Sequence, residues 1–189
     1  MLVVISSSDF IENESEIINE LFASGLEFFH IRKPNIAKDK VCDLLDKINP
    51  KFHKNIALHQ FHELAKDFGM NRLHFTSTER EKAKELDGNY IKSCSIHSVD
   101  EYNQLPNDVF DYCFLSPVFD SISKLNYKKQ LFDLSKMDKT KTIKLIALGG
   151  ISAKNCHLTK KMGFDGVVVL GSIWNEKPVE SFLRIKEEL

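Results

Sequence analysis

The chain has 189 residues, of which 26 are basic and 27 are acidic, so the formal net charge is −1. This length suits one well-buried core, and we predict a single domain over residues 1–189. Because the charges nearly cancel and no apolar stretch reaches the length of a membrane span, nucleic acid and membranes are not expected partners. The four scattered cysteines and the absence of a signal-peptide pattern favour a cytoplasmic protein with reduced thiols, as a monomer or a homo-oligomer.

Short apolar runs alternate with helical patterns along the whole chain. The predicted strands are Leu2–Ser6, Leu26–Ile31, Asn55–Leu58, Arg72–Phe75, Tyr90–Cys94, Asp111–Leu115, Ile143–Leu148 and Asp165–Leu170. The predicted helices are Asn13–Ala23, Ala37–Ile48, Phe61–Phe68, Glu79–Leu86, Val99–Gln104, Gln130–Met137, Ala153–Met162 and Val179–Glu188. Such alternation predicts an α/β fold, a compact (β/α)8 TIM barrel. A doubly wound open sheet remains the alternative, because periodicity does not report closure of the sheet.

The last two strands end in glycines. Gly149 and Gly150 follow one strand, with Ser152 expected to cap the next helix, and Gly171 and Ser172 follow the other. Glycine lets the main chain approach an anion closely, and the loops after strands seven and eight of such barrels commonly hold a phosphate. We therefore predict that the N–H groups around these four strand-end residues bind a phosphate.

Polar residues also follow the other strands. His30, Arg32, His59, Ser95 and His97 all come at or just beyond predicted strand ends, where barrel enzymes carry their chemistry. Lys33 is expected on the solvated rim. A set formed by His30, His59, His74 and His97 has the chemistry of a transition-metal site, but no short spacing links these residues, and we favour no metal.

Six motifs in order resemble one known family. They are His30-Ile-Arg32 with Lys33, Leu73-His74, Ser95-Ile-His97-Ser98, Ser116-Pro117 with Ser121, Ser123 and Lys124, Ala147–Ile151, and Gly166–Ser172. Together they resemble the thiamin phosphate synthase/TenI superfamily of (β/α)8 barrels. The resemblance implies thiamin biosynthesis. The synthase joins a pyrimidine diphosphate to thiazole phosphate with loss of pyrophosphate and with Mg²⁺, whereas the TenI branch aromatises the thiazole phosphate by proton transfer without a metal.

The chain departs from the synthase pattern at the expected metal positions. The synthase motif Gln-x-Arg-x-Lys is here His30-x-Arg32-x-Pro34, and the Asn-Asp pair is His59-Gln60. Glu79 falls at the position of the second metal aspartate. Mg²⁺ prefers carboxylate oxygens, and Gln60 offers only a neutral carbonyl. These departures favour the TenI-like interpretation, which needs no cofactor, whereas the synthase alternative needs Mg²⁺.

The favoured hypothesis is therefore a TenI-like proton transfer on thiazole phosphate. The resemblance implies that His97 moves the proton, that Ser95 and Ser123 orient the thiazole, and that Arg32 and Lys124 hold charge near the ligand. His30, His59 and Ser121 are further predicted substrate-binding residues. One alternative is a divergent synthase. A second alternative is a non-catalytic paralogue that binds thiazole or thiamin phosphate.

Overall fold

A computed structural model describes residues 1–86, 88–120, 132–175 and 177–189 as a closed barrel. Its strands are β1 (Leu2–Ile5), β2 (Phe28–Ile31), β3 (Ile56–Leu58), β4 (Arg72–Phe75), β5 (Ile91–Ile96), β6 (Tyr112–Leu115), β7 (Lys144–Leu148) and β8 (Gly166–Val169). Each strand pairs in parallel with the next, and β8 pairs with β1 through Val3 opposite Val168. The predicted barrel is confirmed, and the open doubly wound sheet is wrong because the ring closes.

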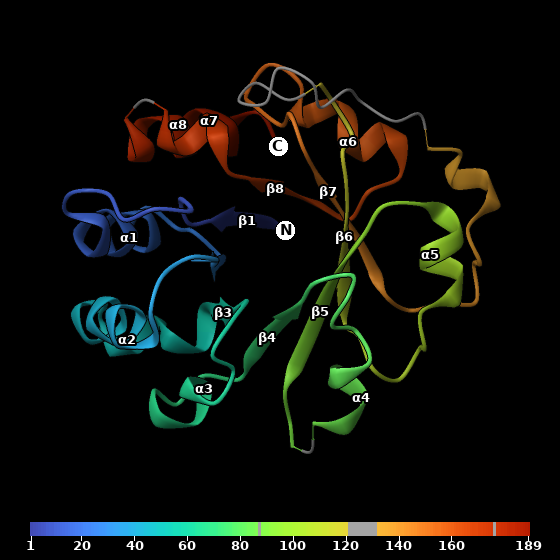
Figure 1. The fold of residues 1–189 in the computed structure, drawn as a ribbon. Coiled ribbons are helices and arrows are strands. Elements are labelled where there is room, and N and C mark those ends of the chain that lie inside the picture. Colours follow the sequence, from blue (N-terminus) through green and yellow to red (C-terminus); the bar gives the residue numbers. More distant parts are fainter. Residues whose placement is uncertain (87, 121–131, 176) are drawn as a thin grey trace.

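Helices lie around the outside of the ring of strands (Figure 1). They are α1 (Glu14–Ala23), α2 (Lys38–Lys47), α3 (Leu64–Asp67), α4 (Lys82–Glu85), α5 (Val99–Gln104), α6 (Cys156–Met162), α7 (Gly171–Trp174) and α8 (Pro178–Glu187). Two short 3₁₀ helices, η1 (Pro50–Asn55) and η2 (Leu134–Lys136), complete the described elements. Several connections hold only one helical turn, which explains how eight units fit into 189 residues. None of the helices within the described ranges combines the length and apolar character needed to cross a membrane.

Two predicted helix features differ from the structure. The helix expected over Gln130–Met137 begins outside the described residues, and the described part forms only η2. Ser152 does not cap the helix after the glycine pair, because α6 begins later, with Asn155 as its N-cap residue. Ser98 caps α5 by accepting a hydrogen bond from the Glu101 N–H.

The core has two layers, because alternate side chains of a strand point to opposite faces. The larger layer lies between strands and helices and includes Ile18, Phe29, Leu45 and Phe182. The smaller layer fills the inside of the barrel with Val3, Ile5, Tyr112, Phe114, Ile146 and Val168. Buried histidines and serines accompany this inner layer, and they form the base of the candidate site.

Candidate active site

A cavity of about 330 Å³ opens where the carboxyl ends of the strands meet. The predicted site residues that line it are Arg32, His59, Ser95, His97, Gly149, Gly150, Gly171 and Ser172. These residues come from β5, from the segments that directly follow β2, β3, β5 and β7, or from the start of α7 after β8, so closure of the barrel brings them together. Ser121, Ser123 and Lys124 lie outside the described residues.

His30 does not line the cavity. Its side chain is fully buried, and its two ring nitrogens lie 3.0 Å from His59 Nε2 and 2.9 Å from the Tyr112 hydroxyl. A neutral imidazole carries one N–H and one lone pair, so His30 donates one of these bonds and accepts the other. His30 therefore supports His59 from below, and a direct contact of His30 with a ligand stays a prediction.

His74 forms a second buried set of hydrogen bonds. Its Nδ1 lies 2.9 Å from Ser93 Oγ, and its Nε2 lies 2.9 Å from Ser95 Oγ. The ring of His74 stacks on His59 with centroids 4.0 Å apart, and it also stacks on Phe114. This set connects the buried interior to Ser95 on the cavity wall.

The three buried histidines are neutral. Desolvation lowers the pKa of His74 to about 3, with the charges of His62 and Arg32 acting in the same direction. Desolvation also holds the pKa of His30 and His59 well below the ordinary value. A cluster of neutral imidazoles can stack and exchange hydrogen bonds without burying charge.

The ring geometry of this cluster does not suit a metal ion. One ligand nitrogen from each of His30, His59 and His74 lies within 4.8 Å of the others. However, His59 and His74 stack with centroids 4.0 Å and planes only 24° apart, so one ion near their nitrogens cannot lie close to the planes of both rings. Metal-bound imidazoles point their lone pairs at one centre. We therefore interpret the cluster as a set of hydrogen-bonded rings and not as a metal site.

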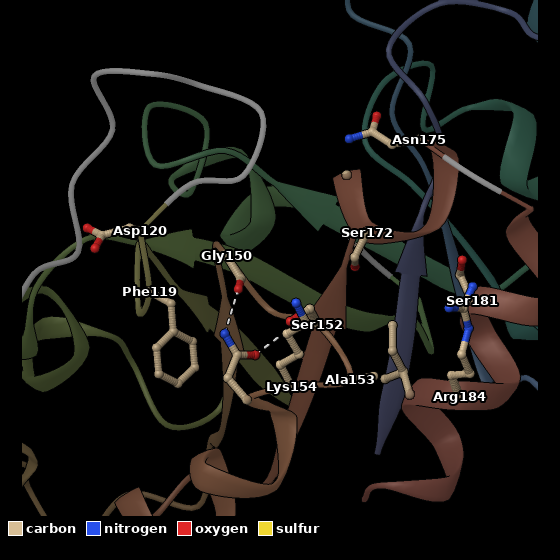
Figure 2. A pocket seen from close by; sticks show the side chains of 13 residues that line it. Phe119, Asp120, Gly150, Ser152, Ala153, Lys154, Ser172, Asn175, Ser181 and Arg184 are labelled. Atoms are coloured by element: carbon tan, nitrogen blue, oxygen red, sulfur yellow. Dashed lines mark hydrogen bonds between the residues drawn. The ribbon is translucent and has the colours of Figure 1, made fainter.

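The glycine pair after β7 forms one wall of the cavity. Gly149 and Gly150 have φ values of 100° and 65°, a region that glycine adopts readily. A Cβ on Gly150 would lie 2.3 Å from the Asp120 carbonyl oxygen, so a side chain has no room there. Asn155 ties the loop together by accepting from the Ser152 N–H and donating to the Gly150 carbonyl, both at 2.8 Å (Figure 2).

The glycines after β7 and β8 form a seam between the cavity and an outer pocket. Gly150, Gly171 and Ser172 line both, and the outer pocket has a volume of about 650 Å³ (Figure 2). Within the described parts of the chain, the buried Ser172 Oγ has no hydrogen-bond partner. A buried hydroxyl without a partner destabilises the protein, because its lost bonds to water are not replaced. A hydrogen bond to a ligand oxygen at the seam would remove this penalty.

Lys33 is buried instead of solvated, so its assignment to an exposed rim is wrong. Its ammonium lies 2.7 Å from both carboxylate oxygens of Glu14 and donates to the Asp9 carbonyl at 2.9 Å. Its backbone N–H donates to the amide oxygen of Gln60 at 3.1 Å. Lys33 therefore fastens the loop before α1 to the end of β2, while Arg32 beside it lines the cavity.

The residues at the expected metal positions do not fit Mg²⁺. The amide oxygen of Gln60 already accepts the Lys33 N–H. Glu79 accepts from the Thr76 hydroxyl at 2.8 Å and from the Lys82 ammonium at 3.0 Å, and these partners hold the pKa of Glu79 below its usual value. Mg²⁺ sites need carboxylate oxygens that are free to face the ion. We therefore derive no step through a metal.

His97 lies at the rim of the cavity in a defined orientation. Its Nδ1 lies 3.1 Å from the Ser116 carbonyl oxygen, which can only accept, so Nδ1 carries the proton in the neutral ring. Nε2 then carries the lone pair. This tautomer presents the Nε2 lone pair that a proton acceptor needs.

Sequence reasoning did not identify Tyr112, Ser93 or Asn155 as part of the site. Tyr112 and Ser93 belong to strands, and only their inward-facing register marks them. They lie opposite each other in the β5–β6 ladder, with side chains directed into the barrel beside His30 and His74. Asn155 was missed because Ser152, an equally favoured N-cap residue type, comes first after the glycine pair.

Comparisons with known proteins agree with this architecture. The family model for thiamine monophosphate synthase matches residues 1–173. A thiamine-phosphate synthase of Oceanobacillus iheyensis is 25% identical over 181 residues, which is 90% of this chain and 88% of the relative. Another from Streptococcus suis is 30% identical over 121 residues, 59% of this chain and 51% of the relative.

Solved structures extend the likeness to three dimensions. A thiamine phosphate pyrophosphorylase of Bacteroides thetaiotaomicron superposes with a TM-score of 0.78 and 29% identity, covering 99% of this chain and 96% of that one. One from Pyrococcus furiosus has a TM-score of 0.82 and 19% identity, covering 99% and 94%, and supports the fold alone. The match over residues 1–173 shows that this chain belongs to the thiamine monophosphate synthase family.

Proposed function

We propose that this chain is a thiamine-phosphate synthase, which joins a pyrimidine diphosphate to thiazole phosphate and releases pyrophosphate. The observation that carries the proposal is the full-length likeness to thiamine-phosphate synthases in both sequence and structure. This likeness favours a transferase over the isomerase that the altered metal positions suggested. The coarser conclusion, an enzyme of thiamin biosynthesis acting on a phosphorylated small molecule, follows from the family itself.

The site supplies parts for both substrates. The seam at Gly150, Gly171 and Ser172 offers backbone N–H groups and a buried hydroxyl to a phosphate. Arg32 lines the same cavity and supplies a permanent positive charge for the diphosphate. Gln60 and Glu79 are already hydrogen-bonded to other groups of the chain. We therefore propose that Arg32, and not a Mg²⁺ held by carboxylates, balances the charge of the diphosphate.

The test is incubation of the chain with a pyrimidine diphosphate and thiazole phosphate, in parallel with and without Mg²⁺. We expect thiamin phosphate and pyrophosphate in equal amounts, measured by chromatography. Binding of both substrates without turnover in either condition would contradict the proposal and favour a non-catalytic binding protein.

Replacing Gly150 with alanine is expected to weaken thiazole phosphate binding by more than tenfold. The added Cβ would lie 2.3 Å from the Asp120 carbonyl oxygen, so the loop must move away from the seam. Gly163→Ala is the matched control. Gly163 has a φ of 98° but a Cβ there would contact only Leu134, at 3.9 Å, and the residue does not line the cavity. We expect that variant to lose about 1–3 kcal/mol of stability and to bind normally. Equal affinities of the two variants for thiazole phosphate, measured by calorimetry, would contradict the proposal that the phosphate binds at this seam.

A second candidate function is the TenI-like proton transfer on thiazole phosphate. The observation that favours it is His97, whose Nε2 lone pair is fixed by the bond of Nδ1 to the Ser116 carbonyl. Replacing His97 with glutamine is then expected to lower isomerisation of the thiazole phosphate tautomer by about 10²–10⁴-fold, with binding retained. Ultraviolet absorption of the aromatised ring measures this rate, and His157→Gln, at an exposed helix position, is the control. If wild-type protein forms thiamin phosphate and leaves the tautomer unchanged, this candidate fails.

A further inference from the structure

Two side chains tie the end of β1 to the segments on either side of it. β1 lies between β8 and β2 in the barrel, and its last paired residue is Ile5, opposite His30 of β2. Beyond this pair, Ser6 forms side-chain hydrogen bonds to the chain that follows β2, whereas Trp174, after β8, reaches the backbone of β1. Because Ile5 also lines the cavity, these bonds lie beside the space for a ligand.

Ser6 holds the main chain of Arg32. Its Oγ accepts a hydrogen bond from the Arg32 N–H at 2.9 Å and donates its own proton to the Arg32 carbonyl at 3.1 Å. A hydroxyl has one proton and a carbonyl oxygen can only accept, so both bonds have a fixed direction. Ser6 is 1% exposed and does not line the cavity, whereas Arg32 does. Ser6 therefore acts on a ligand only through Arg32.

The same segment restrains the guanidinium of Arg32. Its Nη1 lies 3.5 Å from Ser8 Oγ, and the Ser6 N–H donates to the His30 carbonyl at 2.9 Å, which fixes Ser6 itself to β2. Arginine has many rotamers, and holding it in one of them costs conformational entropy. Contacts that restrain its main chain and its tip before a ligand arrives lower that cost when the ligand binds.

On the other side of β1, Trp174 attaches α7 to the barrel. Its indole N–H donates to the Ile5 carbonyl at 2.6 Å, and its ring meets Phe29 edge to face with centroids 6.3 Å apart. α7 begins with Gly171 and Ser172, the seam residues that line the cavity after β8. Trp174 therefore holds this part of the seam against the end of β1.

We infer that the end of β1 sets the spacing between the cation of Arg32 and the glycine seam, with Ser6 and Trp174 as positioning residues for the two halves of the site. Ile5 and Ser6 are consecutive, so the carbonyl that accepts from α7 and the hydroxyl that holds Arg32 belong to one strand end. The assignment of the Arg32 half to a diphosphate and of the seam half to thiazole phosphate rests on the proposed synthase function. Reacting atoms must be held about 3–3.5 Å apart, so this spacing bears directly on the reaction.

The test measures two ligands, inorganic pyrophosphate and thiazole phosphate, by calorimetry on the same variants. Ser6→Ala is expected to weaken pyrophosphate binding by about fivefold or more and to change thiazole phosphate binding by less than about twofold. Ser6→Thr retains the hydroxyl and is expected to restore pyrophosphate binding. Trp174→Phe keeps an aromatic ring beside Phe29 and removes the indole N–H, so we expect the opposite pattern, with thiazole phosphate binding weakened by about fivefold or more.

This crossed pattern is what a merely structural role would not produce, because general destabilisation weakens both ligands together. Thr159→Val and Tyr102→Phe are the matched controls. Each removes a buried hydroxyl that donates to a backbone carbonyl, that of Cys156 or Ile143, and neither residue lines the cavity. We expect both controls to keep both affinities. Equal weakening of the two ligands in Ser6→Ala or in Trp174→Phe would overturn the inference.

Arg32→Met separates failure of the inference from failure of the proposed function. Pyrophosphate binding that falls in Arg32→Met but not in Ser6→Ala would overturn the inference and leave the proposed function standing. Pyrophosphate binding that is unchanged in Arg32→Met would contradict the proposed role of Arg32 and overturn the inference with it. In the same way, thiazole phosphate binding that falls in Gly150→Ala but not in Trp174→Phe would overturn the inference alone.

Hydrogen exchange of the wild-type protein decides the matter if Ser6→Ala does not fold. The Arg32 N–H is expected to exchange about 10²-fold more slowly than in an unfolded chain, because Ser6 Oγ accepts it in a buried place. Exchange at the rate of an unprotected amide would overturn the inference.

Discussion

Replacing Lys33 with methionine is expected to lower the free energy of unfolding by about 3–5 kcal/mol, because it leaves a buried carboxylate without its partner. The side chains of Lys33 and Glu14 are 0% and 2% exposed, and the ammonium contacts both carboxylate oxygens. Burial raises the pKa of Glu14 and lowers the pKa of Lys33, because desolvation outweighs the mutual attraction. Urea denaturation followed by circular dichroism measures the loss.

Two further variants interpret that result. The double variant Lys33→Met with Glu14→Leu is expected to recover most of the stability, since apolar side chains fill the same buried space. Lys40→Met breaks the exposed pair with Asp43 and is expected to cost less than about 1 kcal/mol. If Lys33→Met costs no more than Lys40→Met, the buried pair is not what fastens the loop.

The barrel could be predicted because buried parallel strands leave a direct trace in the sequence. Continuous apolar runs such as Leu145–Ala147 and Val167–Val169 are buried on both faces, as such strands are expected to be. Periodicity alone could not exclude an open sheet, because closure depends on the Val3 pairing with Val168, and the pattern along the chain carries no information on that contact. The glycine seam was predictable for the same local reason, since its conformation is a property of the glycines themselves.

The histidine cluster could not be predicted, because its distances are set across the barrel. His30 and Tyr112 are 82 positions apart and lie 2.9 Å from each other through side-chain atoms. The buried environment of Lys33 could not be predicted for the same reason. Strand alternation indicates that it points away from Arg32, but only the folded chain shows that Glu14 meets it there and that water is excluded.

The choice between the two reactions also depended on evidence beyond the motifs. Gln60 and Glu79, which differ from the family's metal ligands, favour a metal-free isomerase. In the structure both are hydrogen-bonded to lysines of the same chain. The relatives that match along the chain are thiamine-phosphate synthases, and they favour the transferase. Both proposals place thiazole phosphate at the same predicted glycine seam, so they differ in the chemistry proposed near His59 and His97.

Lowering the pH from 6.5 to 5 is expected to destabilise the fold steeply. Desolvation holds the pKa of His30, His59 and His74 below the value of about 6.5 that they have in the unfolded chain. Above that value both states are neutral and stability does not depend on these groups. Below it the unfolded chain binds protons that the folded chain excludes, so stability falls by about 1.4 kcal/mol per pH unit for each histidine. The three cluster histidines give a slope approaching about 4 kcal/mol per pH unit near pH 5, and His62, whose pKa burial also lowers, acts in the same direction.

The groups around the cluster support the expected loss of stability as the pH falls. The charged or titratable groups that act on its rings are Arg32, Arg72 and His62, all of which oppose a further positive charge. Tyr112 contacts His30 as a neutral hydroxyl, because burial raises the pKa of Tyr112. Ordinary carboxyl groups titrate mainly below pH 5, so the interval from 6.5 to 5 reports chiefly on histidine.

Urea denaturation at half-unit steps from pH 8 to 5 measures this slope. The double variant His30→Gln and His59→Asn places amides, which do not titrate, at the positions where the family pattern has Gln and Asn. We expect it to remove the part of the slope that these two histidines contribute, about 2.8 kcal/mol per pH unit. His157→Gln, at an exposed position, is expected to leave the slope unchanged. A wild-type slope below about 1.4 kcal/mol per pH unit, the slope expected for one histidine, would mean that the folded cluster binds protons. The buried rings would then not be the cause of the acid sensitivity.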